Sequence, residues 1–515
     1  MTWQTHEVDN QFDELSGYNL FDSDPALREA LQRAGAEAFA PQLSAYGERL
    51  GRAETYALAE RANRHHPELQ RFDRRGHRVD RVEFDPAWHR LLALYRAEGL
   101  VALPFRDTRP GRWSAWAAGF YLHGQVEAGS LCPATMTQAA IPLLQKESAL
   151  WERLQSKLYS DAHDPQDLPL AQKGAIWLGM GMTEKQGGSD VRANTTIATP
   201  VGAGGRGAEY LLRGHKWFFS APMCDAHLVV ARTAEGGPSC FFVPRWRDDG
   251  SRNAVRIQRL KDKVGNRSNA SSEVEFEDAQ GLLMGEEGRG IPTIIEMATY
   301  TRLNCVIGSA AMLRQGLVQA LAYTRRRRAF GRVLAEQPLM RAVLADLALE
   351  SEAALALLMR LALAYENDQQ GQGGPLDRAW KRILTPAAKF WVCKRAVEAS
   401  GETMEILGGN GYVDDGIMAR LYRETPVNSI WEGSGNVMCL DMLRAIAREP
   451  EAAFALLDEL AALAGDEAVL RNELRALGEA LRLQSGRIDR SLAAAGVSGL
   501  IHRSVAGPTG IEKSA

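Results

Sequence analysis

The hydrophobic pattern divides the chain into a helical, a β and a second helical region. From residue 26 to about 175, apolar residues recur at helical spacing, as in Leu27, Ala30, Leu31 and Ala34. From about 182 to 285 four short apolar runs between Gly, Pro and Asp turns predict strands, at residues 209–214, 227–231, 239–243 and 273–276. Helical spacing returns from about 290 to 445. This segregated order predicts an α+β protein or separate domains.

Several segments carry finer predictions. Residues 1 to about 25 are polar with scattered aromatics and predict an extended arm that packs on another surface. Residues 71–81 are dense in charge and predict a surface loop, whereas residues 337–367 predict a buried bundle helix and 377–407 a further long helix. Residues 446–490 predict exposed helices, and the Gly/Ala/Ser-rich end from Ala493 predicts a frayed terminus. We therefore expect four segments: 1–181, 182–288, 289–445 and 446–515.

Composition narrows the classes of function. The chain has 515 residues and a net charge of −3, so we expect about three domains and no global attraction to nucleic acid or anionic membranes. Its six cysteines are scattered without a C-x-x-C pair, which favours reduced thiols and disfavours a zinc site. The N-terminus has no basic stretch followed by an apolar run, and no uninterrupted run of 18 apolar residues occurs. We expect a cytoplasmic protein without a membrane span or a metal site.

One stretch, residues 426–436, combines groups that suit acid–base chemistry. Glu432 follows the apolar pair Ile430 and Trp431 and precedes a Gly-Ser-Gly turn. Apolar neighbours raise the pKa of a carboxylate toward the range of a general base, and the turn exposes backbone N–H groups that suit an oxyanion or a phosphate. A solvated glutamate before an ordinary turn is the alternative interpretation.

This stretch resembles the motif that carries the catalytic glutamate in acyl-CoA dehydrogenases. Three further stretches resemble that family in the same order: Met182-Thr183-Glu184-Lys185-Gln186-Gly187-Gly188-Ser189-Asp190, Lys216-Trp217-Phe218-Phe219-Ser220 and Arg327-Arg328-Ala329-Phe330-Gly331. The resemblance implies a helical domain, a central β-barrel-like domain and a C-terminal four-helix bundle, here with an extra helical tail. It also implies bound FAD and oxidation of an acyl-CoA by removal of an α-proton and transfer of a hydride to the flavin.

The resemblance also implies roles for individual residues. Glu432 corresponds to the base, Thr183 to a hydrogen-bond partner of the flavin ring, and Ser189 to a contact near the pyrophosphate and the thioester. Phe218 stands where most relatives have a Trp that stacks on the flavin, and Ser220 where they have a Thr at its N5 edge. Arg327 has the spacing of an arginine that reaches the pyrophosphate, often of a neighbouring subunit, and Gly408 and Gly409 match a loop at the adenine. Further expected cofactor contacts are Met182, Phe219, Ser434 and Asn436.

Several segments resemble one branch of the family, named for the DNA alkylation response protein AidB. They are residues 3–6, 123–133, 261–271 and the Glu432 stretch extended through Arg444. The branch implies an FAD-containing homotetramer that binds double-stranded DNA, with a contact at Arg444, and has weak acyl-CoA dehydrogenase activity. From Asp441 to the end, however, nine Lys and Arg face eleven Asp and Glu, and an acidic region supplies few phosphate contacts. A catabolic dehydrogenase of short or branched acyl chains, without a role at DNA, is the alternative.

Overall fold

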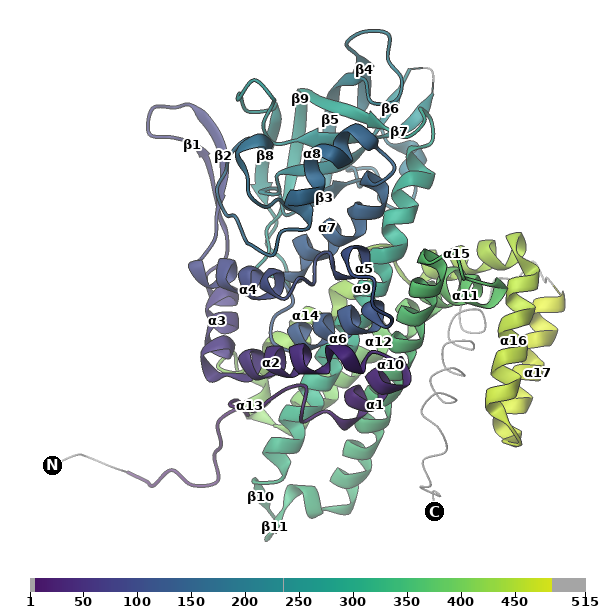
Figure 1. The fold of residues 1–515 in the computed structure, drawn as a ribbon. Helices are drawn as coiled ribbons and strands as arrows, with labels where there is room; N and C mark the ends of the chain where they lie inside the picture. Colours follow the sequence, from purple (N-terminus) through teal and green to yellow (C-terminus); the bar gives the residue numbers. More distant parts are fainter. Residues whose placement is uncertain (1–4, 235, 484–515) are drawn as a thin grey trace. The chain divides into compact units, whose positions relative to one another are not determined.

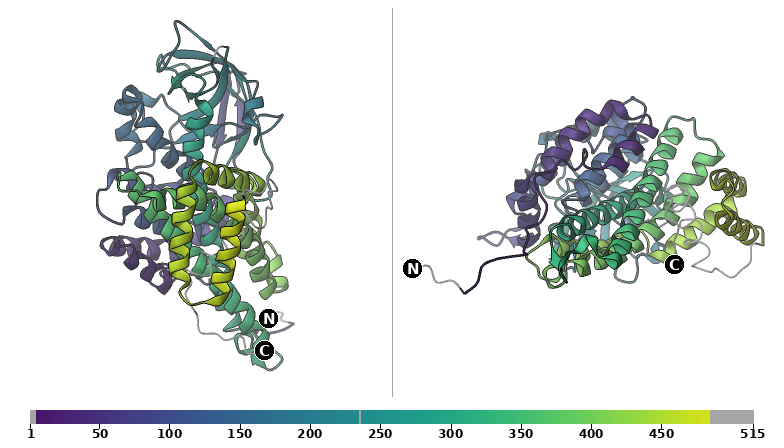
Figure 2. Two further views of the ribbon diagram at one scale, coloured as in Figure 1. Left: turned by 90° about the vertical axis from the view of Figure 1, so that its right-hand side faces the viewer. Right: turned by 90° about the horizontal axis from the view of Figure 1, so that it is seen from below.

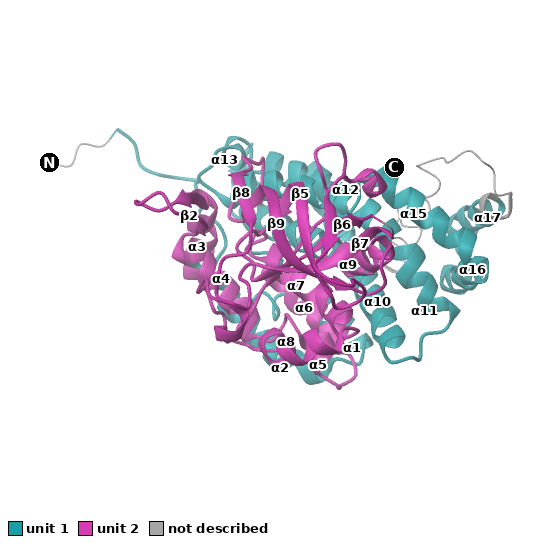
Figure 3. Ribbon diagram, turned by 90° about the horizontal axis from the view of Figure 1, so that it is seen from above, with its two compact units in different colours: residues 1–53, 124–126, 305–515 teal, residues 54–123, 127–304 magenta. Residues whose placement is uncertain are grey.

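The computed structural model describes residues 5–234 and 236–483 and divides the chain into two compact units. Unit 1 comprises residues 1–53, 124–126 and 305–515, and unit 2 comprises residues 54–123 and 127–304 (Figure 3). This division differs from the four consecutive segments predicted above, because helix α1 (Pro25–Arg33) packs against α10 (Pro338–Gln369) of the C-terminal helical region. The frayed terminus expected from Ala493 lies outside the described residues.

Unit 2 passes from helices to strands, as the hydrophobic pattern predicted, and ends within helix α9 (Gly290–Thr324). Its helical part consists of α3 (Ala53–Arg64), α4 (Pro86–Ala97), α5 (Leu103–Arg106), α6 (Arg112–Gly124), α7 (Leu131–Leu144) and α8 (Ser148–Leu158), with short 3₁₀ turns at Leu170–Gln172 and Val191–Ala193. Its main sheet consists of β3 (Leu178–Gly181), β4 (Ile197–Pro200), β5 (Glu209–Ser220), β6 (Ala226–Thr233), β7 (Gly237–Pro244), β8 (Val255–Leu260) and β9 (Ser271–Met284).

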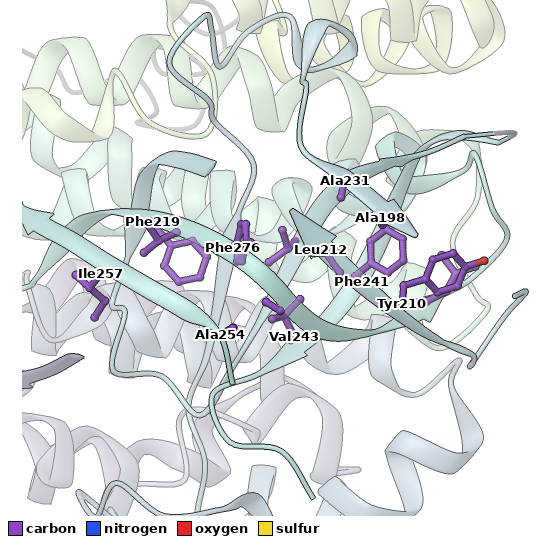
Figure 4. Close-up of a cluster of buried hydrophobic side chains, with 14 of the residues drawn as sticks. Ala198, Tyr210, Leu212, Phe219, Ala231, Phe241, Val243, Ala254, Ile257 and Phe276 are labelled. Atoms are coloured by element: carbon purple, nitrogen blue, oxygen red, sulfur yellow. The ribbon is translucent and has the colours of Figure 1, made fainter. Parts of the chain in front are cut away.

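Five of the seven strands form a closed barrel, while β3 pairs with β5 and β6 and β8 pairs with β9. Strand β5 pairs with both β4 and β9, β4 pairs with β6, β6 with β7, and β7 with β9, so the ladder returns to its start. Closure leaves few free strand edges. Buried side chains of β5, β6, β7 and β9 fill the interior, among them Leu212, Phe241, Val243 and Phe276 (Figure 4). The four predicted strands are therefore confirmed, and the chain has the predicted α+β fold with a central β-barrel.

The charged segment 71–81 is not a loop, so that prediction was wrong. Strands β1 (Glu68–Phe72) and β2 (Arg78–Glu83) form an antiparallel hairpin around a short turn. Charged residues at most positions of β2 masked the strand signal, but Val82 belongs to the buried core cluster of the barrel and Leu69 packs against it. One apolar face is enough to fix a strand when the other face is in water.

Unit 1 is built almost entirely of helices (Figure 1). It contains α1, α2 (Ala40–Gly51), the second half of α9 (Gly290–Thr324), α10, α11 (Pro375–Ala379), a π-helical turn (Trp380–Leu384), α12 (Thr385–Ile406), α13 (Gly409–Tyr412), α14 (Ile417–Asn428), α15 (Gly435–Arg448), α16 (Pro450–Ala464) and α17 (Ala468–Leu483), with 3₁₀ turns at Glu37–Phe39 and Leu334–Glu336 and a small hairpin of β10 (Arg328–Ala329) and β11 (Arg332–Val333). The bundle helix predicted at 337–367 is α10. The helix predicted at 377–407 is interrupted by the π turn.

Two further predictions concern the exposed C-terminal helices and the absence of a membrane span. Helices α16 and α17 lie side by side (Figure 2), in the region where exposed helices were expected. Helix α9 is the one described helix with the length and apolar composition of a membrane span, and 72% of its apolar window is buried within the protein. Burial of that kind is typical of a core helix.

Candidate functional site

The aromatic strand segment lies at a bulge in the barrel wall. The register between β5 and β9 shifts between Lys216 and Phe219, so Trp217 and Phe218 occupy the bulged stretch. A bulge re-aims side chains and is common beside active sites. Phe218 is 51% exposed, although a phenyl ring in a regular barrel strand would be expected to pack. The bulge therefore presents an aromatic surface.

Lys261, which follows β8, contacts both the exposed ring of Phe218 and the half-buried ring of Trp217. Its ammonium lies 3.4 Å from the ring centroid of Trp217 and 4.7 Å from that of Phe218, and it pairs with Glu273 at 2.6 Å. Contacts between a cation and an aromatic face of this kind contribute about 0.5–2 kcal/mol. Sequence reasoning gave Lys261 no role, because nothing in its spacing indicates that it lies across the strands from Phe218.

The loop at Met182–Asp190 is hydrogen-bonded directly to this bulge. The Trp217 backbone N–H donates to the Thr183 carbonyl at 2.8 Å, and Asn194 Nδ2 donates to the Met182 carbonyl at 2.8 Å. A Cβ at Gly188 would lie 2.7 Å from Thr183 Oγ1, so only glycine leaves that hydroxyl in place. Thr183 is half-buried and Ser189 is exposed. The structure thus brings the Thr183 loop and Phe218 together.

A buried ion pair that sequence reasoning missed supports this half of the site. Glu184 Oε1 accepts from Lys216 Nζ at 2.7 Å, and both side chains are fully buried. The same carboxylate accepts from Gln186 Nε2 and from the backbone N–H groups of Thr195 and Thr196, at 2.7, 2.7 and 3.2 Å. Burial alone would raise the pKa of Glu184, but the ammonium and these donors lower it to about 2. The pair fastens the Thr183 loop to strand β5.

Phe219 and Ser220 differ in their placement. The Phe219 side chain is buried in the barrel core and stacks on His227, with ring centroids 3.9 Å apart (Figure 4). Its ring therefore faces away from the surface that Phe218 presents, and a cofactor contact would have to use its backbone. Ser220 is half-buried at the end of β5. Alternation along a strand explains why neighbouring aromatics separate to opposite faces.

Glu432 lies in a turn between α14 and α15 that has unusual backbone geometry. Its φ is +57°, and Gly433 follows with φ +104°. A non-glycine residue in the left-handed region costs of order 1 kcal/mol or more, and such strain is concentrated at functional sites. The Glu432 side chain is half-buried. The turn fixes the direction of the carboxylate.

A buried lysine is hydrogen-bonded to the backbone of this turn. Lys389 of α12 donates from Nζ to the Gly433 carbonyl at 2.8 Å. Burial raises the pKa of the nearby Cys305 thiol well above its usual range; the Lys389 charge opposes that rise and the Glu432 charge adds to it. Both charges therefore lie near the same thiol. Lys389 shares a helical face with Cys393 and Ala396, and a lysine on such an apolar face was a signal that sequence reasoning left unused.

The arginine run lies where α9 ends. The helix stops at Thr324, and Arg327 and Arg328 lead into the β10–β11 hairpin. Arg327 is half-buried, and one of its Nη atoms donates to the backbone carbonyl of Asn10. Phe330 forms the hairpin tip with φ +52° and is 98% exposed.

The remaining predicted residues lie on exposed helix ends. Gly408 has φ +62° and precedes α13, as expected of a helix that ends in glycine, and Gly409 is exposed. Ser434 and Asn436 are exposed at the start of α15, and Arg444 is exposed further along it. All predicted site residues thus form two groups. Met182, Thr183, Ser189, Phe218, Phe219 and Ser220 belong to unit 2, and Arg327, Gly408, Gly409, Glu432, Ser434, Asn436 and Arg444 belong to unit 1.

One cavity within the described residues is lined by none of these residues. It has a volume of about 360 Å³ and lies in unit 2 between the β1–β2 hairpin, α4 and the segment before β3. His89 and His163 lie 3.1 Å apart in its wall, and Trp177 Nε1 donates to His163 Nδ1 at 3.1 Å. Burial lowers the pKa of His163 to about 3, so both hydrogen bonds form with a neutral ring.

Three family models match successive parts of the chain. Residues 10–165 match the "Adaptive response protein AidB N-terminal domain", residues 179–279 the "Acyl-CoA dehydrogenase, middle domain" and residues 288–447 the "Acyl-CoA dehydrogenase, C-terminal domain". The "Putative acyl-CoA dehydrogenase AidB" of Escherichia coli (strain K12) is 48% identical over 494 residues, which cover 96% of this chain and 90% of the relative. The chain belongs to the AidB branch of the acyl-CoA dehydrogenase superfamily.

Other relatives of this superfamily support the assignment. "Acyl-CoA dehydrogenase family member 11" of Caenorhabditis elegans is 28% identical over 94% of this chain and 79% of the relative. The structure of C. elegans ACDH-11 in complex with C11-CoA superposes with a TM-score of 0.86 at 26% identity, covering 98% of this chain and 92% of that one. The structure described as "Bd2924 apo-form" gives the same TM-score at 30% identity, with 96% and 97% covered. The chain is thus an oxidoreductase of the acyl-CoA dehydrogenase family with that family's fold.

Proposed function

We propose that this AidB-branch protein binds FAD and oxidises an acyl-CoA with Glu432 as the general base. One observation carries the proposal: the Glu432 turn has a strained left-handed backbone that a buried lysine supports. A solvated surface glutamate needs neither feature. A structure of an acyl-CoA dehydrogenase from Bacillus anthracis, similar in fold at 18% identity and a TM-score of 0.66, is described as complexed with FAD.

Each unit carries residues whose chemistry suits one part of a flavin nucleotide. In unit 2, Phe218 offers an exposed ring that the Lys261 ammonium contacts, and the Thr183 hydroxyl keeps its place because position 188 lacks a side chain. In unit 1, Arg327 offers a guanidinium, which suits a pyrophosphate because it can donate two parallel hydrogen bonds. Gly408, Gly409, Ser434 and Asn436 add exposed backbone and small polar groups at helix ends. We assign FAD contacts to these residues and to Met182, Ser189, Phe219 and Ser220.

In the proposed reaction Glu432 takes the proton from the α-carbon of the thioester. The Cα–H electrons form the Cα=Cβ bond, and FAD held by the residues above would supply the two-electron acceptor for the hydride that leaves Cβ. The backbone N–H of Glu432 donates to the thioester oxygen and stabilises the developing enolate. Lys389 holds the turn through the Gly433 carbonyl, so that the carboxylate keeps its direction while it gains a proton.

The proposal is tested by anaerobic mixing of the purified protein with acyl-CoA esters. Butyryl-CoA and C11-CoA are suitable first probes, because a fold relative was solved with C11-CoA. We expect a yellow protein whose visible flavin absorption bleaches with at least one ester. A protein that binds FAD but is reduced by no ester in a broad screen would exclude the dehydrogenase reaction.

A role in DNA binding is the part of the AidB-branch proposal with the weakest support from this chain's charges. Arg444 is exposed on α15, but residues 441–515 carry a slight acidic excess. If binding occurs, phosphate contacts will make it strongly dependent on salt. We expect retention of a duplex at low salt that falls steeply at moderate salt and weakens in Arg444→Ala. No retention at low salt would leave the catabolic dehydrogenase as the better description.

We also propose that the protein is a homotetramer, and the β10–β11 hairpin supports self-association. Phe330 is 98% exposed at the hairpin tip, where its positive φ would favour Asn rather than Phe. Burying such a ring contributes about 1.5–3 kcal/mol. We therefore expect Phe330→Asn to weaken assembly by about ten- to hundredfold without destabilising the hairpin.

Sedimentation velocity over a range of protein concentrations measures this effect. Val201→Ser is the matched control, because Val201 is an exposed apolar residue of unit 2 outside any proposed interface. An unchanged assembly in Phe330→Asn would contradict a role of the hairpin tip in self-association.

A further inference from the structure

Within unit 1, the N-terminal arm makes a series of contacts with elements from the C-terminal part of the chain. Asn10 holds the start of the β10–β11 hairpin from both sides: its Nδ2 donates to the Arg328 carbonyl, and its Oδ1 accepts from the Arg328 N–H, each at 2.9 Å. The Asn10 backbone carbonyl accepts from the guanidinium of Arg327. Asn10 has φ +55°, a conformation that Asn adopts far more readily than most residues.

The residues that follow Asn10 bind different elements in turn. Gln11 Oε1 accepts from Asn410 Nδ2 of α13 at 2.9 Å. The Asp13 carbonyl accepts from Arg326 at 3.1 Å. The Glu14 carboxylate accepts the first backbone N–H of α14, that of Ile417. The five residues from Asn10 to Glu14 thus connect the end of α9, the hairpin, α13 and α14.

The end of this segment is anchored in the interior of unit 1. The buried side chain of Gln319 in α9 exchanges two hydrogen bonds with the backbone of Leu15, one accepted from its N–H at 2.8 Å and one donated to its carbonyl at 2.9 Å. A side-chain amide thereby mimics a strand partner. This anchor fixes the position of the preceding residues without any regular secondary structure.

Two of the elements held by the arm carry residues assigned above to the cofactor. Arg327 lies at the hairpin, and Gly408 and Gly409 immediately precede Asn410. We propose that residues 10–15, here called the strap, set the position of Arg327 and the Gly408–Gly409 turn for the phosphate and adenine parts of FAD. This inference rests on the proposed flavin function. It adds to that function a cofactor-positioning element that lies more than 300 residues away in sequence from Arg327.

The strap acts by pre-organisation rather than by direct contact with the cofactor. An arginine with four rotatable bonds loses conformational entropy when it binds an anion, and a guanidinium already held by a carbonyl loses less. The Asn10 carbonyl accepts from only one Nη of Arg327. The guanidinium has five N–H donors, so others can bind a phosphate. Loss of the strap is therefore expected to weaken FAD binding rather than to strengthen it.

The test compares wild-type protein, Asn10→Ala and a deletion of residues 2–12. Apoprotein is titrated with FAD, and hydrogen exchange is measured at residues 326–334 and 408–413 with and without FAD. Removing the two Asn10 side-chain bonds should raise the FAD dissociation constant about tenfold, and the deletion should raise it further. Hydrogen exchange should be faster than in wild type at residues 326–334 and 408–413 and should be unchanged in the barrel strands. Val8→Ala is the control, since Val8 is exposed in the same arm.

The outcomes separate this inference from the proposed function. An FAD affinity equal to that of wild type in both variants overturns the strap, while flavin binding itself stands. Tighter binding after deletion also overturns it, since the arm would then cover the site rather than organise it. If wild-type protein binds no FAD, the proposed function fails; faster exchange in the variants would then show a strap that serves only the fold.

Discussion

Replacing Glu432 with Gln is expected to abolish reduction of the flavin by acyl-CoA while FAD remains bound. The amide has nearly the shape of the carboxylate, so the turn with its left-handed backbone should persist. It cannot accept the α-proton, and removal of a placed general base slows proton transfer by about 10²–10⁴-fold. Stopped-flow absorbance under anaerobic conditions measures the rate of bleaching directly.

Glu402→Gln is the matched control for this prediction. Glu402 is an exposed glutamate of α12 and belongs to none of the assigned contacts. Its variant should be reduced at the wild-type rate. Bleaching of Glu432→Gln at a rate close to that of wild type would show that another group is the base.

Replacing Glu184 with Gln is expected to have the largest effect on stability. It leaves the Lys216 ammonium buried without its counter-charge, and removing one partner of a buried pair costs about 3–5 kcal/mol. Hydrogen exchange in β5 and β9 under increasing urea reports the local free energy of opening, which suits a protein of two units that need not unfold in one step. Asp190→Asn, an exposed change in the same loop, should have little effect.

A double variant distinguishes a lost ion pair from general disruption of the loop. Adding Lys216→Met to Glu184→Gln removes the buried unpaired charge, and we expect recovery of a large part of the lost free energy. If the losses of free energy in the two single variants simply add in the double variant, the two side chains are not directly coupled.

The ion pair also predicts how the stability of the barrel depends on pH. The pKa of Glu184 falls from its ordinary value of 4.5 to about 2 in the folded protein, so the folded state prefers the charged carboxylate. Its contribution to stability is fully present above pH 4.5 and is lost as the pH falls toward 2. In Glu184→Gln this part of the acid dependence should disappear.

Much of the architecture could be predicted because apolar periodicity reports it directly. The strand runs of the barrel and the apolar helix α10 were found from spacing alone, since their faces are covered over most of their length. The β1–β2 hairpin was missed because charged residues occupy most of β2, including the buried Asp80. The sequence predicted that the N-terminal arm packs on another surface, and the arm does so. That this surface, and the partner of α1, belong to the C-terminal helices was missed, because contacts between distant segments leave no local pattern.

The site could be predicted only in part, and for the same reason. The chemical groups Thr183, Phe218, Arg327 and Glu432 were found because they sit in short motifs. The residues that orient these groups were not found. Lys261, Lys389 and the Glu184–Lys216 pair act through partners that lie far away in sequence, with no spacing to reveal them. Local motifs indicate the chemistry, whereas the supporting contacts need the fold.

The measurement that bears most directly on the central claim is the FAD content of the purified protein, with Phe218→Ala and Arg327→Ala beside it. The account predicts one FAD per chain in the wild type and a clear loss of affinity in each variant, because one residue serves the ring and the other the phosphates. Apoprotein that takes up no FAD, or variants from both units that bind it as tightly as wild type, would contradict the account.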